Sequence, residues 1–278
     1  MRVADLVNFI KARERHRVAK ERGGKIVRPD PIISQYRFCN VRRNDDRVTK
    51  WIFENYLDRW RDHKYLWFAL VMARLFNNEG ALSRIKPLVL PFKPESIREH
   101  LHERTAEKLK NFNAAYIVST NGRAMNKVDY VIDHVLQPLW DNRKKLARDM
   151  DVGQLANVYL VLSNQNGLGS FMAAQVIADW KYADPNKWED FNTFAASGPG
   201  SRRGMNRVLG LPISALMSEA AFRERLSVLR DAVNKRLSML PLTAQDVQNC
   251  LCEFDKYERV RLGEGRPKQR YPQTGVIL

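Results

Sequence analysis

Hydrophobic and polar residues alternate along this chain mainly with the period of an α-helix. An apolar stripe on a basic first helix consists of Val3, Leu6, Val7 and Ile10. Further helices are predicted over residues 46–61, 63–76, 95–112, 126–150, 213–240 and 243–261. The last of them begins with a Thr-x-x-Asp capping-box pattern at Thr243. One short stretch, 115–120, is predicted as a strand or an extended linker, and the Asn-Gly pair that follows it marks a turn. The pattern predicts a single mainly α domain over residues 1–278, with two lobes, 1–125 and 126–278, within it.

The segment 158–180 contains two apolar helices joined by a G-x-G turn. The first helix covers 158–163, and the second begins near the second glycine of the pair Gly167 and Gly169. Glycine allows a tight turn and a close approach of the backbone to a partner. The first N–H groups of the second helix have no intrahelical acceptor, so they can bind an anion. We therefore predict that Gly167, Gly169 and Ser170 contact a nucleic-acid phosphate.

The net charge makes a polyanion a natural partner for this turn. The 278 residues include 47 Lys and Arg against 31 Asp and Glu, which gives a formal charge of +16. Such an excess attracts nucleic acids, although basic enzymes with small substrates also exist. We predict DNA contacts by Arg42 and Arg43 in an early basic segment and by Lys268 in the basic tail. The early segment also fits an Arg–Asp network that supports a site.

The same composition argues against several other classes of protein. No run of about 18 apolar residues is present, so we expect no membrane span. Residues 1–23 are too charged for a secretory signal. The three cysteines, Cys39, Cys250 and Cys252, indicate a reducing compartment, and their spacing disfavours zinc or an iron–sulfur cluster. We expect a cytoplasmic protein without a metal ion or other cofactor, and without a P-loop for ATP.

Three acidic residues are candidates for a catalytic base. Asp179 shares a face with Gln175 on an otherwise apolar helix, where a carboxylate is ion-paired or has a shifted pKa. Asp190 lies in an aromatic segment, Trp-Glu-Asp-Phe-Asn-Thr-Phe, downstream of the hairpin. Glu253 lies on one stripe of the last helix with Asp246, where it could orient an arginine or bind an amine. Capping or ion pairing is the structural alternative for Asp179, and a salt bridge is that for Glu253.

A glycine-rich segment, 195–204, is the second strong signal. It is predicted to be a loop in which Gly200 allows close backbone approach, while Ser201, Arg202 and Arg203 bind a phosphate with a hydroxyl and two guanidinium groups. The structural alternative is a surface loop with two solvated arginines. The aromatic residues of 51–68 are interpreted as core rather than as base-stacking platforms.

Parts of this pattern resemble the helix-hairpin-helix DNA glycosylases. Those enzymes place an L-x-G-x-G hairpin and an apolar helix before an essential aspartate, as at Gly167, Gly169 and Asp190 here. The lysine that forms a Schiff base in bifunctional members is replaced by Phe171, and the proline before the first glycine is replaced by Asn166. The cysteines of an iron–sulfur cluster are also missing. The resemblance implies a glycosylase-like helical bundle and disfavours a lyase.

Over about 33–270 the chain resembles the phage α-glutamyl/putrescinyl thymine pyrophosphorylases, which are related to the helical domain found with 5-hydroxymethyluracil DNA kinases. Four segments carry the likeness: Phe-Met-Ala-Ala-Gln-Val-Ile-Ala-Asp-Trp, Ser-Gly-Pro-Gly-Ser-Arg-Arg-Gly, Arg-Phe-Cys-Asn-Val-Arg-Arg and Cys-Glu-Phe-Asp-Lys-Tyr. The resemblance implies double-stranded DNA as substrate, an amino acid or polyamine as co-substrate, and functional coupling to such a kinase in a phage-infected bacterium.

The implied reaction joins an amine to the thymine methyl carbon and expels phosphate or pyrophosphate. It needs a carboxylate that deprotonates the amine, for which Asp190 leads and Asp179 and Glu253 follow. It also needs positive charge on the departing group, which Arg202 and Arg203 would supply. Two alternatives remain open: a monofunctional DNA glycosylase acting on modified pyrimidines, and a non-catalytic DNA-binding module.

Overall fold

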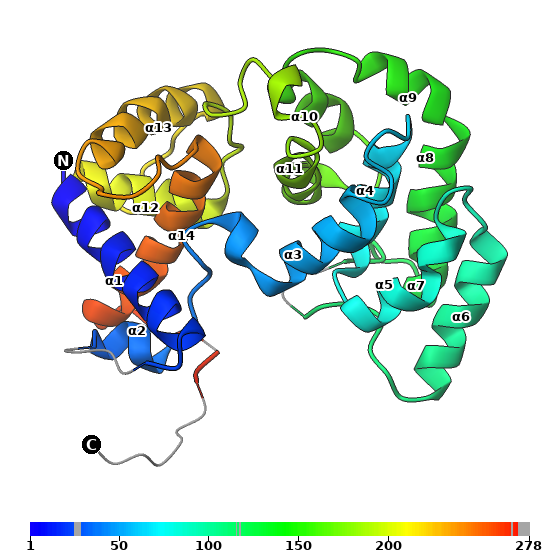
Figure 1. The fold of residues 1–278 in the computed structure, drawn as a ribbon, viewed down its shortest axis with the longest axis horizontal. Coiled ribbons are helices and arrows are strands. Elements are labelled where there is room, and N and C mark those ends of the chain that lie inside the picture. The colour runs from blue at the N-terminus through cyan, green and yellow to red at the C-terminus, as the bar shows by residue number, and fades with distance from the viewer. Residues whose placement is uncertain (25–28, 115, 117, 268, 272–278) are drawn as a thin grey trace. The chain divides into compact units, whose positions relative to one another are not determined.

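Apolar helical stripes build this protein, as the sequence period predicts. The computed structural model describes residues 1–24, 29–114, 116, 118–267 and 269–271. In this part of the chain the regular elements are helices, and one isolated antiparallel bridge joins Tyr36 and Arg270 (Figure 1). The prediction of a mainly α protein is confirmed, whereas the likeness to the glycosylase bundle stays a prediction.

The chain divides into two compact units. Unit 1 comprises Met1–Asp46 and Asn192–Leu278, and unit 2 comprises Arg47–Phe191. The boundaries differ from the predicted lobes 1–125 and 126–278, because the apolar stripe of the first helix is buried against helices near the other end of the sequence. Unit 1 is therefore discontinuous in sequence, whereas unit 2 is a single stretch.

Unit 1 has one apolar core, to which the first helix and the last three helices contribute. Leu6 and Ile10 of the first helix and Phe222, Leu251 and Phe254 of the later helices are all buried there. The elements of unit 1 are α1 (Val3–Glu21), α2 (Pro31–Gln35), η1 (Arg43–Asp45), α12 (Pro199–Leu209), α13 (Glu219–Asn234) and α14 (Ala244–Arg261).

Unit 2 is organised around one fully buried helix. Every residue of α4 (Leu66–Phe76) is buried, and this helix packs against α11 (Gly169–Trp180). The α11 helix also packs antiparallel against α10 (Leu155–Ser163) of the hairpin (Figure 1). The remaining elements of unit 2 are α3 (Arg47–Ile52), η2 (Phe53–Leu57), α5 (Glu79–Ile85), η3 (Lys86–Leu88), α6 (Pro94–Ala106), α7 (Lys127–Tyr130), η4 (Val131–Leu136), α8 (Gln137–Asp141), α9 (Arg143–Asp149) and η5 (Pro185–Lys187).

Several predicted helices are shorter or interrupted in the structure. The predicted helix 126–150 contains a π-helical stretch, η4, and separate α-helical pieces. The predicted helix 213–240 begins only at α13, where the Ser218 hydroxyl accepts the Ala221 N–H at 3.2 Å as an N-cap. The described residues of 115–120 form no strand, and residues 115 and 117 lie outside the described part of the chain.

The start of the last helix follows its predicted sequence signal. The Thr243 hydroxyl accepts the Asp246 N–H at 3.3 Å, and the Asp246 carboxylate accepts the Thr243 N–H at 3.0 Å. This is the reciprocal capping box that the Thr-x-x-Asp pattern predicts. Among the described residues, no helix combines the length and the apolar character needed to cross a membrane.

Candidate nucleic-acid interface and phosphate site

The hairpin turn of unit 2 requires its glycines for different reasons. Gly167 has a φ of +78° and Gly169 a φ of +57°, a region that other residues seldom adopt. A Cβ on Gly167 would lie 2.4 Å from Cγ2 of Val135 in η4, whereas a Cβ on Gly169 would meet open space. Gly167 therefore permits both the turn and close packing on η4, and Gly169 permits the turn alone.

The α11 helix begins at this turn without a side-chain cap. Its N-cap residue, Leu168, has no capping side chain, and Gly169 and Ser170 are exposed. The N–H groups in the first turn of a helix have no intrahelical acceptor, and the helix dipole adds partial positive charge there. This geometry suits the phosphate contact that the sequence predicts for Gly167, Gly169 and Ser170.

Asp190 caps the first helix of the same hairpin. One carboxylate oxygen accepts the Leu155 N–H at 2.7 Å, and the other accepts the Ala156 N–H at 3.0 Å. Asp190 lies far along the chain from these residues, so sequence reasoning did not find this cap. The side chain is partly exposed, unlike those of the other two candidate bases.

Asp179 belongs to a buried ion pair in unit 2. Its side chain is 0% exposed, and its carboxylate accepts two N–H groups of the buried Arg74, one of them at 2.8 Å. Arg74 also donates to Asn77 at 3.0 Å and to Thr49 at 3.0 Å. This arrangement matches the ion-paired alternative for Asp179 and gives its carboxylate no access to a substrate in this conformation.

The glycine-rich segment is mostly helical in unit 1, and the prediction of a loop is wrong. Pro199 occupies the first turn of α12, a position that proline tolerates because the N–H there needs no intrahelical acceptor. A Cβ on Gly200 would lie 2.5 Å from Sγ of Cys252, and one on Gly204 would lie 2.0 Å from the carbonyl oxygen of Leu251. The two glycines therefore allow α12 and α14 to approach closely.

Ser201 and Arg202 have partners at the start of α12. The Ser201 hydroxyl is buried, and it accepts the Gly198 N–H at 2.9 Å and donates to the Gly198 carbonyl at 3.0 Å. Arg202 donates to the Ser197 hydroxyl at 2.7 Å and to Glu219 at 3.2 Å. Ser201 thus caps its helix, and the charge of Arg202 is balanced by Glu219.

Arg203 takes part in a cluster of three arginines around one aspartate, which we call the Asp255 cluster. The Asp255 carboxylate is 1% exposed and lies 2.8 Å from Nε of Arg203, 2.9 Å from Nε of Arg207 and 3.7 Å from Nε of Arg259. Arg207 is also paired with Glu264. The side chains of Arg203 and Arg259 are each 39% exposed, so the cluster presents positive charge to solvent.

Sequence reasoning missed Asp255, Arg207 and Arg259 in this cluster. A signal was present, because Arg203 and Arg207 are four residues apart, as are Asp255 and Arg259, and residues at that spacing share a helix face. The glycines and proline around Arg203 predict a loop, to which helical spacing does not apply.

Glu253 is largely buried on α14 and has two partners. Its Oε2 accepts the Cys39 N–H at 2.9 Å and pairs with Nζ of Lys256 at 2.6 Å. The negative charge of Glu253, and then desolvation, raise the pKa of the Cys39 thiol to about 12. The salt bridge is the structural alternative that the sequence left open for Glu253.

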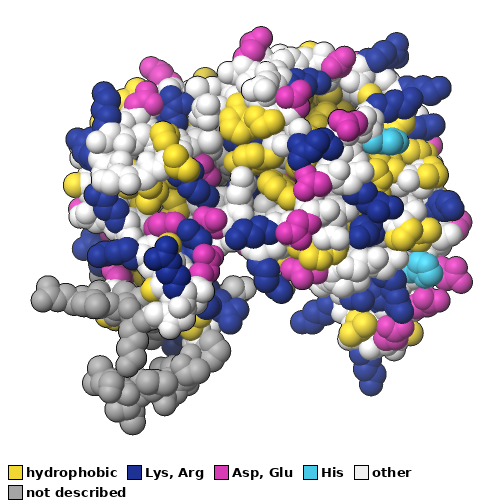
Figure 2. All heavy atoms as spheres, in the orientation of Figure 1, with side chains coloured by type: hydrophobic (Ala, Val, Ile, Leu, Met, Phe, Trp, Pro, Cys, Tyr) yellow, Lys and Arg dark blue, Asp and Glu magenta, His cyan; other side chains and the backbone are white. Residues whose placement is uncertain are grey.

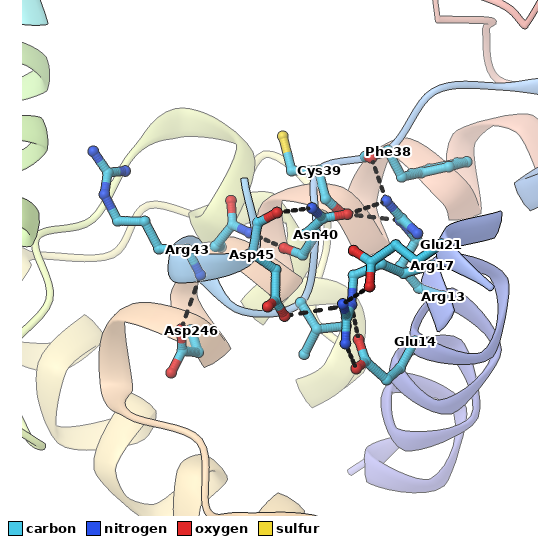
Figure 3. Close-up of polar contacts among 12 residues, drawn as sticks. Arg13, Glu14, Arg17, Glu21, Phe38, Cys39, Asn40, Arg43, Asp45 and Asp246 are labelled. Carbon is cyan, nitrogen blue, oxygen red and sulfur yellow. Dashed lines mark hydrogen bonds and ion pairs between the residues drawn. The ribbon is translucent and has the colours of Figure 1, made fainter. Parts of the chain in front are cut away.

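The early basic segment is tied into unit 1 by hydrogen bonds and by an ion pair between Arg17 and Asp45 at 3.4 Å (Figure 3). Arg13 donates to the backbone carbonyls of Phe38 and Cys39, each at 3.0 Å. The Arg43 backbone N–H donates to Asp246 at 3.4 Å, and its side chain extends away from that contact. Arg42 donates to the carbonyls of Leu240 and Pro241. Lys268, the remaining predicted DNA contact, lies outside the described residues.

The predicted site residues fall into two groups. Asp179, Asp190 and the hairpin glycines belong to unit 2, whereas the residues of α12, α14 and the early basic segment belong to unit 1. Within unit 1, contacts between α12 and α14 bring Arg203 to Asp255, and within unit 2 the cap brings Asp190 to the start of α10. The described residues contain no group of three or more His, Cys, Asp or Glu that could hold a metal ion.

The comparison with protein families identifies the relationship. The family model described as the helical domain of 5-hmdU DNA kinase matches residues 2–266. The chain belongs to this family. Comparisons with curated proteins and with solved structures gave no significant match.

Membership in the 5-hmdU DNA kinase helical-domain family links the chain to the hydroxymethyluracil modification pathway. The matched range includes the hairpin, Asp190 and the whole Asp255 cluster. Lys and Arg side chains are spread over the face drawn in Figure 2 and are interspersed with Asp and Glu. On this face, Lys and Arg side chains therefore do not gather into a single basic patch.

Proposed function

We propose that this protein is a DNA-modifying transferase that attaches an amine to the thymine methyl carbon of phosphorylated 5-hydroxymethyluracil. The observation that carries the proposal is the family match over residues 2–266. The net charge of +16 and the uncapped start of α11 support DNA as the substrate. The reaction would follow a kinase and take place in the cytoplasm of a phage-infected bacterium, with an amino acid or a polyamine as co-substrate.

In the proposed step, the amine nitrogen forms a bond to the methyl carbon while the bond from that carbon to the phosphate oxygen breaks. The phosphate or pyrophosphate leaves with the electron pair of the broken bond. The amine loses one proton, which a carboxylate accepts. The protein thus has to supply a base and a stabilising positive charge for the leaving group.

Asp190 is the candidate base that the structure favours among the three predicted acids. Asp179 is sealed in an ion pair with Arg74, and Glu253 is largely buried beside Lys256. Asp190 is partly exposed, and each of its oxygens accepts one backbone N–H, which leaves further lone pairs available to an ammonium group.

Arg203 and Arg259 are the candidates for binding a phosphate of the DNA at unit 1. Both side chains are partly exposed, and the Asp255 carboxylate lies beside Nε of Arg203 at 2.8 Å and of Arg259 at 3.7 Å. Arg259 replaces Arg202 in this role, because Arg202 is already neutralised by Glu219. Guanidinium forks bind phosphate oxygens bidentately, which makes an oriented arginine effective here.

The test is amine transfer by Asp190→Asn on DNA that a 5-hydroxymethyluracil kinase has phosphorylated. The asparagine keeps one acceptor oxygen for the cap, so we expect transfer to be lost while DNA affinity stays within about twofold and the free energy of unfolding falls by about 1 kcal/mol. Mass spectrometry of digested nucleosides measures the product, and binding and urea unfolding are measured in parallel. Full transfer by this variant would remove Asp190 from the mechanism.

A non-catalytic DNA-binding module is a second candidate, because each predicted acid has a structural partner. Asp190 caps α10, Asp179 pairs with Arg74, and Glu253 pairs with Lys256. On this reading the protein binds DNA without modifying it. Absence of any new nucleoside after incubation of the wild-type protein with phosphorylated DNA and mixed amines, together with intact DNA binding, would favour the module. The appearance of abasic sites would instead favour a monofunctional glycosylase.

A further inference from the structure

Unit 2 contains a cleft that the proposed function does not use. Its volume is about 830 Å³, and all of its lining belongs to unit 2. The walls come from the segment 61–67 at the start of α4, from α9, and from the end of α11 with the segment 183–188. Trp188 of this lining is two residues before Asp190, so the cleft is adjacent in sequence to the helix cap.

The lining of the cleft has an excess of cationic side chains. Arg61, Lys64, Lys144, Arg148 and Lys187 face three aspartates in the lining set. Lys187 pairs with Asp151 at 3.0 Å, whereas among the described residues no carboxylate lies within ion-pair distance of Lys64, Lys144 or Arg148. These three cations are therefore available to an anion.

Two indole N–H groups in the lining are buried without an acceptor. Nε1 of Trp67 and Nε1 of Trp188 have no hydrogen-bond partner among the described residues, although both side chains are more than nine-tenths buried. An indole nitrogen can only donate a hydrogen bond, and a buried donor without an acceptor costs about 1–3 kcal/mol. Both nitrogen atoms are themselves enclosed by the protein, so a ligand would reach either one only after a local rearrangement of the lining.

The lining also has an aromatic surface that is open to a planar group. Trp180 at the end of α11 is only partly buried, and its ring meets that of Trp188 edge-on at a centroid distance of 5.7 Å. Cationic side chains beside aromatic rings are the combination that binds nucleotides, since the rings stack on a base and the cations bind the phosphate. The volume lies within the range of about 300–1,000 Å³ that is typical of small-molecule sites.

We propose that this cleft binds a nucleotide, with its phosphate on Lys144 and Arg148 and its base against Trp180. The inference goes beyond the proposed function, because it concerns an unmodified nucleotide and requires neither an amine nor a phosphorylated base. The nucleotide can be free or part of a DNA strand, and the chemistry of recognition is the same.

The test is equilibrium binding of thymidine 5′-monophosphate, of an oligothymidylate and of inorganic phosphate to the full chain. Arg148→Ala and Lys144→Ala should each weaken binding of the nucleotide probe about tenfold, because each removes one charge-assisted contact. Lys145→Ala is the matched control, since Lys145 is on the same helix, lies outside the cleft and pairs with Asp149 at 2.7 Å. Binding is followed by calorimetry and by tryptophan fluorescence.

Trp180→Leu tests the contact with the base, because the Trp180 ring is only partly buried. The substitution should weaken binding of the nucleotide probes several-fold and leave binding of inorganic phosphate unchanged. If binding of thymidine 5′-monophosphate is weakened by Arg148→Ala, the ligand is a free nucleotide. If only binding of the oligothymidylate is weakened, the ligand is a nucleotide within a DNA strand. Binding of inorganic phosphate alone, or equal effects of the Arg148 and Lys145 variants, would overturn the proposal whether or not amine transfer occurs.

Discussion

Asp179 of unit 2 and Asp255 of unit 1 are both buried and both pair with arginine, but only the arginines around Asp255 reach solvent. Asp179 of unit 2 has 0% exposure and pairs with Arg74, whose other N–H groups go to the neutral side chains of Asn77 and Thr49. Asp255 of unit 1 has 1% exposure but faces three arginines, of which two reach solvent. We call the Asp179–Arg74 pair closed, because neither side chain reaches solvent, and the Asp255 cluster displayed, because two of its arginine side chains do.

The difference lies in stoichiometry and exposure, because burial of the carboxylate is the same. The side chains of Arg74 and Asp179 are at most 1% exposed, so their pair presents no charge to a ligand. A single carboxylate among three guanidinium groups leaves an excess, even after Glu264 balances Arg207. A buried aspartate is therefore a structural element in unit 2 and a support for an anion site in unit 1.

Breaking the closed pair should give the largest effect. Arg74→Leu leaves the Asp179 carboxylate buried without its cation, which should lower the free energy of unfolding by about 3–5 kcal/mol. Urea denaturation followed by circular dichroism measures the loss. Lys145→Ala, which removes an exposed pair of unit 2, should cost less than about 1 kcal/mol.

Asp255→Asn provides the comparison with the displayed cluster. Arg203 and Arg259 remain hydrated through their exposed atoms, so this variant should lose less stability than Asp179→Asn does under the same conditions. Equal or larger destabilisation by Asp255→Asn would contradict the distinction between a closed and a displayed charge.

Glycine substitutions should give an intermediate loss of stability. They also distinguish the two units, because only the substitution in unit 2 should change DNA binding directly. Gly204→Ala in unit 1 places a Cβ about 2.0 Å from the Leu251 carbonyl oxygen, so α12 must move and the free energy of unfolding should fall by about 1–3 kcal/mol. Gly169→Ala in unit 2 meets open space and adds only left-handed strain of about 1–2 kcal/mol. The second variant should also weaken DNA binding, measured by fluorescence anisotropy, whereas the first should act through stability alone. A stable Gly204→Ala protein would show that α12 and α14 need no glycine contact.

The pH dependence of stability should give the smallest effect. Burial acts to raise the pKa of Glu258 in unit 1, but hydrogen bonds and charges of Arg261 and Arg2 outweigh burial and lower this pKa below its ordinary value of 4.5. A carboxylate whose pKa is lower in the folded state stabilises the protein above the unfolded pKa, and this contribution disappears as the pH falls through the folded pKa. As the pH falls into the acid range, the free energy of unfolding should therefore decrease less for Glu258→Gln than for the wild type. The difference should be under about 1 kcal/mol, as measured by urea unfolding at each pH. Parallel slopes would exclude Glu258 as a source of acid sensitivity.

Local sequence rules predicted the elements that depend on near neighbours. The helical stripe of Val3 to Ile10, the Thr243 capping box and the left-handed glycines of the hairpin all follow from residues a few positions apart. The helical class also follows from the period of the apolar positions. The helical structure of Gly200 to Gly204 cannot be predicted in this way, because a glycine-rich helix that packs closely on a partner helix has the same composition as a loop.

The contacts that decide the site depend on residues distant in sequence. Asp190 caps α10 from 35 positions away, and Arg203 meets Asp255 from 52 positions away. A single sequence contains no signal for which of many acidic and basic residues will meet. Asp179 was correctly recognised as a carboxylate that needs a partner, but only the fold identifies that partner as Arg74.

The discontinuity of unit 1 has a consequence for synthesis on the ribosome. The α1 helix is synthesised first, the whole of unit 2 (Arg47–Phe191) follows, and α12, α13 and α14 are synthesised last. The nascent first helix therefore exposes Leu6 and Ile10 until the last helices emerge, while unit 2 can already collapse around α4. A chain released early would keep a folded middle and an aggregation-prone amphipathic leader.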